Sequence, residues 1–277
     1  MNADFHIHTR YSDGGKTPKE IIKLCQENDI KYISITDHNT FRFYKENKDY
    51  DLKIIRGMEV NVAYNQDLTL HMLLYNYDLN SPLLSEYYKK NRAYEIYHFN
   101  KKVKLCEELF NIKIDKKIKR RFIKNNNYFD RVRLNNLLVE CKIAKDPVEA
   151  FSKYTKRINE TKRYKISVQD FFKLEKDTRG IASLAHPLRY KRSLEEIEKI
   201  ILELQNKYNL RVVEAINNRQ TLEDEQKLIK FCNAHNLYIS GGSDSHYKFG
   251  EAPNMTVGKI LNRKIDEKEL TFLKLLK

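Results

Sequence analysis

The sequence predicts an α/β fold, a barrel-like arrangement of parallel strands interrupted by a helical insertion. Strand-like runs alternate with helical patterns over about the first 80 residues and resume near residue 180, whereas residues 83–172 contain helical patterns without strand-like runs. Six of the eight histidines lie in short clusters at or after strand-like runs, often near a carboxylate. Functional groups of parallel α/β barrels converge at the carboxyl ends of the strands, so the two patterns together predict one site built from both ends of the chain.

The composition is typical of a globular protein with a full-sized core. The chain has 277 residues, of which 41% are hydrophobic and 32% are charged. No run approaches the roughly 18 apolar residues of a membrane helix, and the N-terminus lacks a basic and then apolar leader, so we expect no membrane anchor and no signal peptide. The four cysteines are far apart and form no CxxC pair. This pattern favours free thiols and a cytoplasmic protein.

The N-terminal portion is predicted to contain four strands and a well-capped helix. Period-2 alternation places His6 and His8 on the same face of the first strand. Thr17 and Glu20 form a capping box, with Pro18 at the first position of the helix that follows. The predicted strands cover residues 3–8, 32–36, 53–60 and 68–74.

The remainder of the chain is predicted to contain the insertion and a second strand–helix portion. Lys/Glu/Leu patterns predict insertion helices over residues 95–110 and 134–141. Later strands are predicted over 180–185, 212–215 and 237–240, with helices over 194–208 and 222–236 between them. We therefore assign residues 1–82 and 173–277 to a barrel domain that contains the metal site. Residues 83–172 are assigned to a basic, mainly helical insertion domain.

The positive charge of the chain is concentrated in the insertion. Residues 89–165 contain 23 Lys/Arg and 9 Asp/Glu, a balance of +14, whereas the other 200 residues contain 29 of each sign. Such a segment is suited to an anion, such as a phosphate ester or a nucleic acid. The alternative is a solvated helical surface with no ligand.

The clustered histidines and carboxylates form a ligand set for divalent metals. Neutral imidazole together with carboxylate suits Zn²⁺, Mn²⁺ or Fe²⁺. Taken alone, His71 or His186 is explained equally well as a core histidine. The pair of His6 and His8 on one strand face is not, so the set as a whole predicts a multinuclear metal centre.

These motifs resemble those of the PHP (polymerase and histidinol phosphatase) family of metal-dependent phosphoesterases. The matching segments are HIHTRYSDGG at 6–15, TDH at 36–38, GMEV at 57–60, His71, AHP at 185–187 and GSDSH at 242–246. The resemblance implies a distorted (β/α)₇, TIM-like barrel that holds two to three divalent ions (Mn²⁺, Fe²⁺ or Zn²⁺). It also implies the ligands: His6, His8, Glu59 and Asp244 for the first metal, Asp13, His38 and His246 for the second, and Glu59, His71 and His186 for the third.

A metal centre of this kind needs no nucleophilic side chain. Clustered metals lower the pKa of a bound water from 15.7 to about 7, and the resulting metal-bound hydroxide attacks phosphorus. Asp37 precedes the candidate ligand His38. It is either a carboxylate that orients a liganding imidazole or a structural cap, and the sequence leaves both open.

The insertion resembles that of the family branch that acts on nucleoside 3′,5′-bisphosphates and short oligoribonucleotides. The resemblance rests on FDRVRLN at 129–135 and AFSKY at 150–154. In that branch an Arg-x-His element faces the substrate phosphate; Arg131 matches its arginine, and Arg133 occupies the position of its histidine. Arg189, three residues after His186, is a third candidate because guanidinium binds phosphate bidentately.

The leading hypothesis is a phosphoesterase that hydrolyses phosphomonoesters of a nucleotide or short RNA, with no membrane or obligate protein partner. One alternative is a histidinol-phosphate phosphatase, although a small cationic substrate does not account for the basic insertion. The other is a nucleic-acid-binding module in which the metal site is structural.

Overall fold

The computed structural model describes residues 1–46, 50–126, 128–158, 163–218, 220–246, 257–259 and 263–276. The chain divides into two compact units. The first combines Met1–Ser85 with Lys165–Lys277, and the second is Glu86–Tyr164. The second segment of the first unit thus begins at Lys165 rather than near Lys173, because it includes a short strand and the helix that follows.

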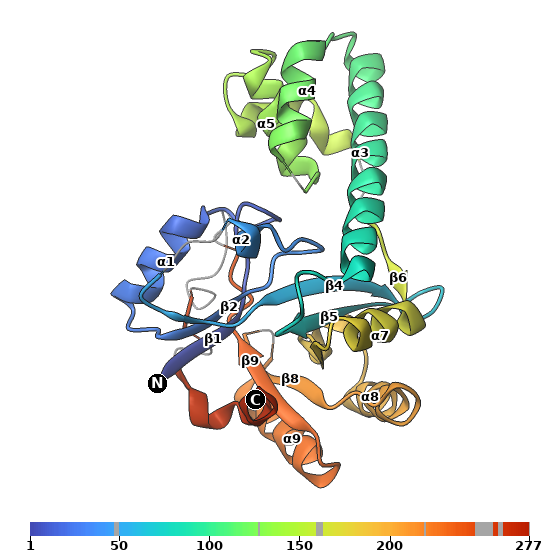
Figure 1. The fold of residues 1–277 in the computed structure, drawn as a ribbon. Helices are drawn as coiled ribbons and strands as arrows, with labels where there is room; N and C mark the ends of the chain where they lie inside the picture. Colours follow the sequence, from blue (N-terminus) through green and yellow to red (C-terminus); the bar gives the residue numbers. More distant parts are fainter. Residues whose placement is uncertain are drawn as a thin grey trace. The chain divides into compact units, whose positions relative to one another are not determined.

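The first unit contains two sheets, which lie side by side in Figure 1. One has the order β10-β1-β2-β3, with β1 parallel to β2, β2 parallel to β3, and β10 antiparallel to β1. Its strands are β1 (Asn2–Ile7), β2 (Tyr32–Ile35), β3 (Lys53–Ile54) and β10 (Ile265–Asp266).

The second sheet is mixed, with the order β6-β4-β5-β7-β8-β9. The pairs β4–β5 and β5–β7 are antiparallel, and the other pairs are parallel. Its strands are β4 (Gly57–Ala63), β5 (Thr69–Tyr75), β6 (Ile166–Ser167), β7 (Ile181–Leu184), β8 (Val212–Asn217) and β9 (Tyr238–Gly242).

Two features of these sheets differ from the sequence prediction. The strand β5 is antiparallel to its neighbours because the link from β4 is a tight turn, in which the Tyr64 N–H donates to the Leu68 carbonyl at 3.0 Å. A parallel strand would need a crossover of a dozen or more residues. The predicted strand 53–60 is in fact two strands, β3 and β4, which belong to different sheets.

The sheets approach each other at two isolated parallel bridges, Ile7 with Ser245 and His38 with Glu59. Regular ladders among the described residues do not close them into one barrel. The prediction of an α/β fold is therefore confirmed, whereas the structure does not establish a closed barrel. Both bridges lie where strands of the first sheet end. The first brings β1 beside the end of β9, and the second brings the end of β2 beside β4.

Helices flank the sheets, and α7, α8 and α9 lie along the outside of the second sheet (Figure 1). The predicted capping box is present: Thr17 Oγ1 accepts from the Glu20 N–H at 3.3 Å, and a Glu20 carboxylate oxygen accepts from the Thr17 N–H at 2.7 Å. The helices of this unit are α1 (Pro18–Glu27), α2 (Arg42–Lys45), α7 (Val168–Asp177), α8 (Leu194–Tyr208) and α9 (Leu222–Ala234).

The second unit is helical and has a core of its own. The long α3 (Pro82–Phe110) begins in the first unit and continues into the second, where it is followed by α4 (Lys116–Asn125), α5 (Arg131–Glu140) and α6 (Pro147–Lys153). Buried side chains such as Phe99, Phe129 and Leu134 form this core.

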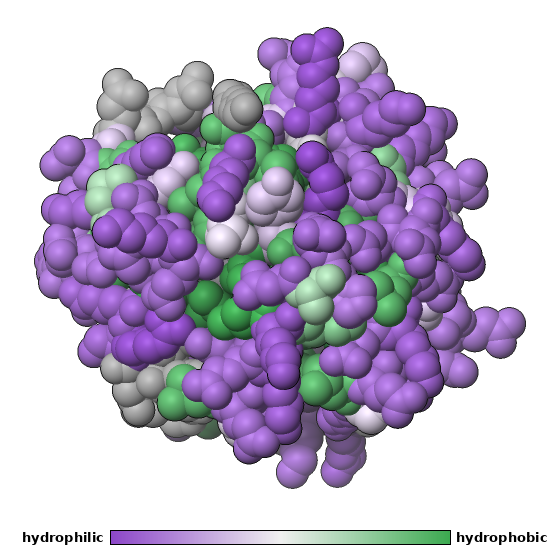
Figure 2. Space-filling model, turned by 90° about the horizontal axis from the view of Figure 1, so that it is seen from below, coloured by the Kyte–Doolittle hydropathy of each residue, from purple (hydrophilic) through white to green (hydrophobic). Residues whose placement is uncertain are grey.

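The face of the molecule that Figure 2 shows is largely hydrophilic, and its hydrophobic residues gather mainly near the middle. Within the described part of the chain, each helix is too short or too polar to cross a membrane. All four cysteines are free thiols, as the sequence predicts.

Candidate metal centre

The nine predicted ligand side chains meet in one cluster at the edge where the sheets approach each other. His6 lies on β1 and Glu59 on β4, whereas His38, His186 and Asp244 follow the ends of β2, β7 and β9. The remaining ligands are His8 and Asp13 after β1, His71 near the start of β5, and His246 after β9. Because β5 is antiparallel, its beginning lies at the edge where its neighbours end.

The cluster contains three overlapping groups of residues. Within each group, the potential ligand atoms all lie within 4.8 Å of one another. They are His6, His8, Glu59 and Asp244; His8, Asp13, His38 and His246; and His38, Glu59 and His71. His186 is outside these groups, but its Nε2 is 3.0 Å from Glu59 Oε1. The structure therefore brings together every residue for which the sequence predicts a ligand role.

Glu59 lies at the centre of the cluster. Its Oε2 is 3.3 Å from His6 Nε2, 3.1 Å from His8 Nε2 and 3.3 Å from His38 Nδ1. This buried oxygen accepts no hydrogen bond from the described residues, although three ring nitrogens lie around it. Buried polar atoms in proteins nearly always have a partner, so this arrangement fits a divalent cation among these atoms.

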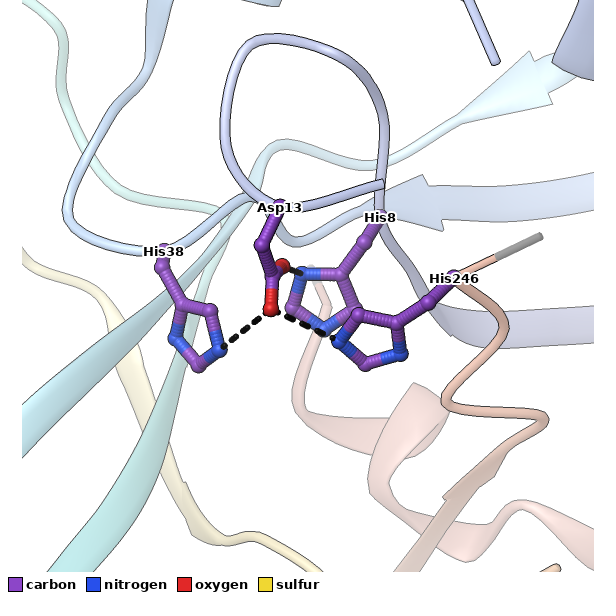
Figure 3. Close-up of side chains that lie close together, drawn as sticks. All are labelled: His8, Asp13, His38 and His246. Carbon is purple, nitrogen blue, oxygen red and sulfur yellow. Dashed lines mark ion pairs between the residues drawn. The ribbon is translucent and has the colours of Figure 1, made fainter. Parts of the chain in front are cut away.

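Asp13 connects three histidines on another side of the cluster (Figure 3). Its Oδ2 lies 3.2 Å from His246 Nε2 and 3.9 Å from His38 Nε2, and its Oδ1 lies 3.5 Å from His8 Nδ1. Figure 3 shows the four side chains pointing toward one another from the loops after β1, β2 and β9. Their mixed nitrogen and oxygen donors suit Zn²⁺, Mn²⁺ or Fe²⁺.

Glu214 is a functional candidate that sequence reasoning missed. This fully buried carboxylate on β8 has its Oε1 2.8 Å from His6 Nδ1, and its Oε2 accepts from the His186 backbone N–H at 2.6 Å. With Nδ1 donating to Glu214, the imidazole of His6 presents Nε2 to the cluster with its lone pair free to bind a metal. The one signal in the sequence is a lone charge within the buried run Val212–Asn217.

The Asp37 carboxylate hydrogen-bonds to the loop that follows β1. Its carboxylate accepts from the Thr9 N–H at 2.7 Å, from Thr9 Oγ1 at 2.6 Å and from Ser12 Oγ at 2.6 Å. Ser12 Oγ is in turn 3.4 Å from His8 Nδ1. These contacts favour the structural alternative, in which Asp37 fixes the loop that carries the ligands.

The pKa values in the cluster are shifted in opposite directions. Burial lowers the pKa of His8, but the carboxylates of Asp244 and Glu59 outweigh it and raise that pKa to about 9. At His186, burial dominates and lowers the pKa to about 4. Burial would raise the pKa of Glu59, but the surrounding histidines, His38 foremost, hold it well below its usual range. The central carboxylate is therefore ionised at neutral pH and ready to bind a cation.

Two ligand positions have an uncommon backbone conformation. His186 has a φ of 25° and Asp244 a φ of 50°. Positive φ costs a non-glycine residue about 1–3 kcal/mol and is concentrated at functional sites. Tyr190 supports this region, since its hydroxyl accepts from the His71 N–H at 2.8 Å and donates to the Ala185 carbonyl at 3.0 Å.

The three predicted arginines occupy different environments. Arg189 Nη1 lies 3.5 Å from Asp244 Oδ2, and its side chain is 42% exposed. The other two belong to the second unit. Arg131 Nη2 lies 3.5 Å from the Ile158 carbonyl, whereas the Arg133 side chain is buried and its backbone N–H donates to Asp130. The structure thus brings Arg189 to the cluster.

Comparison with known proteins identifies relatives that match most of the chain. The family model for the PHP domain matches residues 4–209. A 3′,5′-nucleoside bisphosphate phosphatase from Chromobacterium violaceum is 26% identical over 251 residues, which cover 88% of this chain and 87% of that protein. The 5′-3′ exoribonuclease Rnm of Escherichia coli is 24% identical over 253 residues, covering 88% of this chain and 84% of that protein.

A solved structure is similar over nearly the whole chain. It is an amidohydrolase from Chromobacterium violaceum, with bound sulfate and no metal. It aligns with a TM-score of 0.70 at 25% sequence identity and covers 97% of this chain and 95% of that one. The similarity therefore extends over both units of the chain.

Proposed function

The chain belongs to the PHP domain family and is a metal-dependent phosphoesterase, and from this premise we propose that it removes phosphate from nucleotides. The substrates we propose are nucleoside 3′,5′-bisphosphates or short oligoribonucleotides. Of two relatives that match along most of their length, one is named a 3′,5′-nucleoside bisphosphate phosphatase and the other a 5′-3′ exoribonuclease. The observation that carries the proposal is the buried Glu59 carboxylate, whose oxygens lie 2.7–3.3 Å from ring nitrogens of five histidines.

We infer that the ligand cluster holds two to three divalent ions. His6, His8, Glu59 and Asp244 would bind the first, Asp13, His38 and His246 the second, and Glu59, His71 and His186 the third. When bound, such ions supply a hydroxide at neutral pH and neutralise charge on the phosphoryl oxygens. The ligand distances within each group support this assignment.

The seven strands with four or more described residues support a distorted (β/α)₇ barrel as the scaffold of this centre. The two isolated bridges supply the contacts between the sheets that such a barrel would need. Ligands from six strands then converge at one end, as they do in other barrel enzymes.

Residues beyond the ligands prepare the site for a phosphate ester. Glu214 fixes the ring of His6 and the backbone at His186, so the ligands are positioned before a metal arrives. The half-exposed Arg189 is the cation that we expect to bind a substrate phosphate oxygen. Most of the ligands are buried, but His71 is 21% exposed, so we expect substrate to approach the cluster from the side of His71.

The charge of the basic insertion favours a nucleotide as the substrate rather than a small cationic molecule. Because the excess positive charge of the chain lies in residues 89–165, this segment favours a polyanion. Arg131 and Arg133 remain our candidates there for contacts with the substrate phosphates. If the substrate were histidinol phosphate, by contrast, the positive charge of the insertion would have no function in substrate binding.

The proposal is tested by phosphate release from adenosine 3′,5′-bisphosphate by the full chain. We expect turnover that a chelator abolishes and that added Mn²⁺ restores. His38→Ala removes a cluster ligand and should reduce kcat/KM by a factor of 10² or more, which corresponds to about 2.7 kcal/mol. The matched control is His235→Ala, because His235 Nδ1 donates to the Phe231 carbonyl at 2.9 Å, away from the cluster.

Two outcomes would contradict the proposal. If no phosphomonoester in a panel were hydrolysed with any of the three metals, the site would not be catalytic. If histidinol phosphate were turned over with a higher kcat/KM than adenosine 3′,5′-bisphosphate, the substrate class would be wrong.

A further inference from the structure

The helix α4 has an unusual concentration of positive charge on one face. Its ten residues include six Lys or Arg and no Asp or Glu. Five of the cations are exposed and follow helical spacing along one face: Lys116, Lys117, Arg120, Arg121 and Lys124. From the first to the last of them the helix rises about 12 Å, at 1.5 Å per residue.

The orientation of this basic face is fixed by packing on the other side of the helix. Phe122 is buried in the core of the second unit, and Ile118 and Ile123 pack against that core. The N-cap Asp115 accepts from the backbone N–H groups of Lys117 and Ile118, both at 2.8 Å, so its carboxylate is occupied with capping. The cations therefore face away from the core as a defined surface.

Other helices of the chain pair their lysines with glutamates four residues away. The pairs with separations of at most 2.9 Å are Lys90–Glu86, Lys153–Glu149, Lys199–Glu195, Lys207–Glu203 and Lys227–Glu223. In α4, within the part of the chain that the structure describes, the corresponding ion pair is Arg121 with Glu140 at 3.9 Å. Like charges four residues apart destabilise a helix, so this face opposes folding and is suited to an external anion.

We propose that the basic face of α4 binds the phosphodiester backbone of single-stranded RNA, at phosphates other than the one that is hydrolysed. This inference rests on the proposed function and narrows its substrate class to a polymer. A single phosphate cannot contact cations spread over about 12 Å, whereas successive phosphates of a strand can. An anionic membrane is less suitable, because a helix that lies in a membrane buries its apolar face in lipid, and here that face packs on the core.

The experiment measures binding of a fluorescein-labelled 12-nucleotide RNA to the full chain by anisotropy, in EDTA so that hydrolysis does not intervene. The test variant is Lys116→Gln/Arg120→Gln/Lys124→Gln. The control, Lys199→Gln/Lys207→Gln/Lys227→Gln, removes the same charge from α8 and α9. We expect the test variant to raise Kd at least tenfold, and to reduce the slope of log Kd against log[salt] by about 2, since each single-strand phosphate contact contributes about 0.7.

A second variant, Lys116→Arg/Lys124→Arg, keeps the charges and should bind RNA like the wild type. Equal losses of RNA affinity in the test and control variants would overturn the inference, because net charge alone would then explain binding. It would also be overturned if the test variant lost binding to phosphatidylserine vesicles while its RNA affinity stayed unchanged. RNA binding is measured without metal and so does not depend on catalysis. If RNA affinity depended on α4 but the chain hydrolysed no nucleotide, the proposed function would be refuted and the inference about α4 would stand.

Discussion

Replacing Glu214 by Gln tests whether this buried residue positions a metal ligand. Both oxygens of Glu214 act as acceptors, one for His6 Nδ1 and one for the His186 N–H. A glutamine offers one oxygen and one NH₂ group, so it can serve only one of the two donors. If its oxygen faces the His186 N–H, its NH₂ group faces His6 Nδ1 and shifts the ring proton to Nε2, the atom that points to the cluster.

The expected magnitude follows from this change of tautomer. Replacing a residue that orients a metal ligand usually lowers metal affinity 10- to 100-fold, or about 1.4–2.8 kcal/mol. We therefore expect Glu214→Gln to weaken Mn²⁺ or Zn²⁺ binding by this factor in a competition titration against a chromogenic chelator. The matched control is Glu225→Gln, a buried glutamate on α9 whose Oε1 lies 2.7 Å from Arg263 Nη2.

The reasoning would be refuted if Glu214→Gln bound metal as tightly as the wild type. A loss of thermal stability equal to that of Glu225→Gln, without a change in metal affinity, would show that Glu214 contributes only to folding. A loss of metal affinity in Glu225→Gln as large as that in Glu214→Gln would also refute it.

Three further predictions concern the cluster, its arginine and the thiols. Mn²⁺ at 100 times its Kd should stabilise the fold by about 2.7 kcal/mol and raise Tm by about 5–10 °C in a melting experiment, and an unchanged Tm would exclude tight binding. Arg189→Ala should raise KM for a nucleotide substrate about tenfold, with Arg189→Lys intermediate; an unchanged KM would place Arg189 outside the substrate site. Burial raises the pKa of all four thiols, to about 11 for Cys106 and about 12 for Cys232, but Cys141 alone among them is partly exposed. It should therefore react faster with DTNB at pH 8 in the folded protein than Cys25, Cys106 or Cys232, and a buried thiol that reacts as fast would contradict this assignment.

The ligand cluster could be predicted from the sequence because its residues are concentrated in short motifs at strand ends. Period-2 alternation predicts that His6, on β1, and His8, the residue after β1, point the same way, and the cap at Thr17 is a local interaction. The direction of β5 could not be predicted in this way. It depends on pairing with β7, which is more than 100 residues away, and on the tight turn after β4.

Glu214 was missed for a related reason. A lone carboxylate in a buried strand carries no motif, and its partner His6 is 208 residues away. The split of the predicted strand 53–60 likewise depends on which sheet each half joins. Interactions between residues close in the sequence could thus be predicted, whereas pairing between distant segments required the structure.

The long sequence separation within the metal centre has a consequence for how the protein acquires its metal. During synthesis at about 5–20 residues per second, His6 and His8 leave the ribosome roughly 10–50 s before Asp244 and His246. In that interval the early histidines lack the ligands that follow β9, and closing so large a loop is slow. A complete cage exists only once the end of β9 lies beside β1. We therefore expect the metal that is available after folding, rather than the first metal that the nascent chain meets, to determine the loaded form.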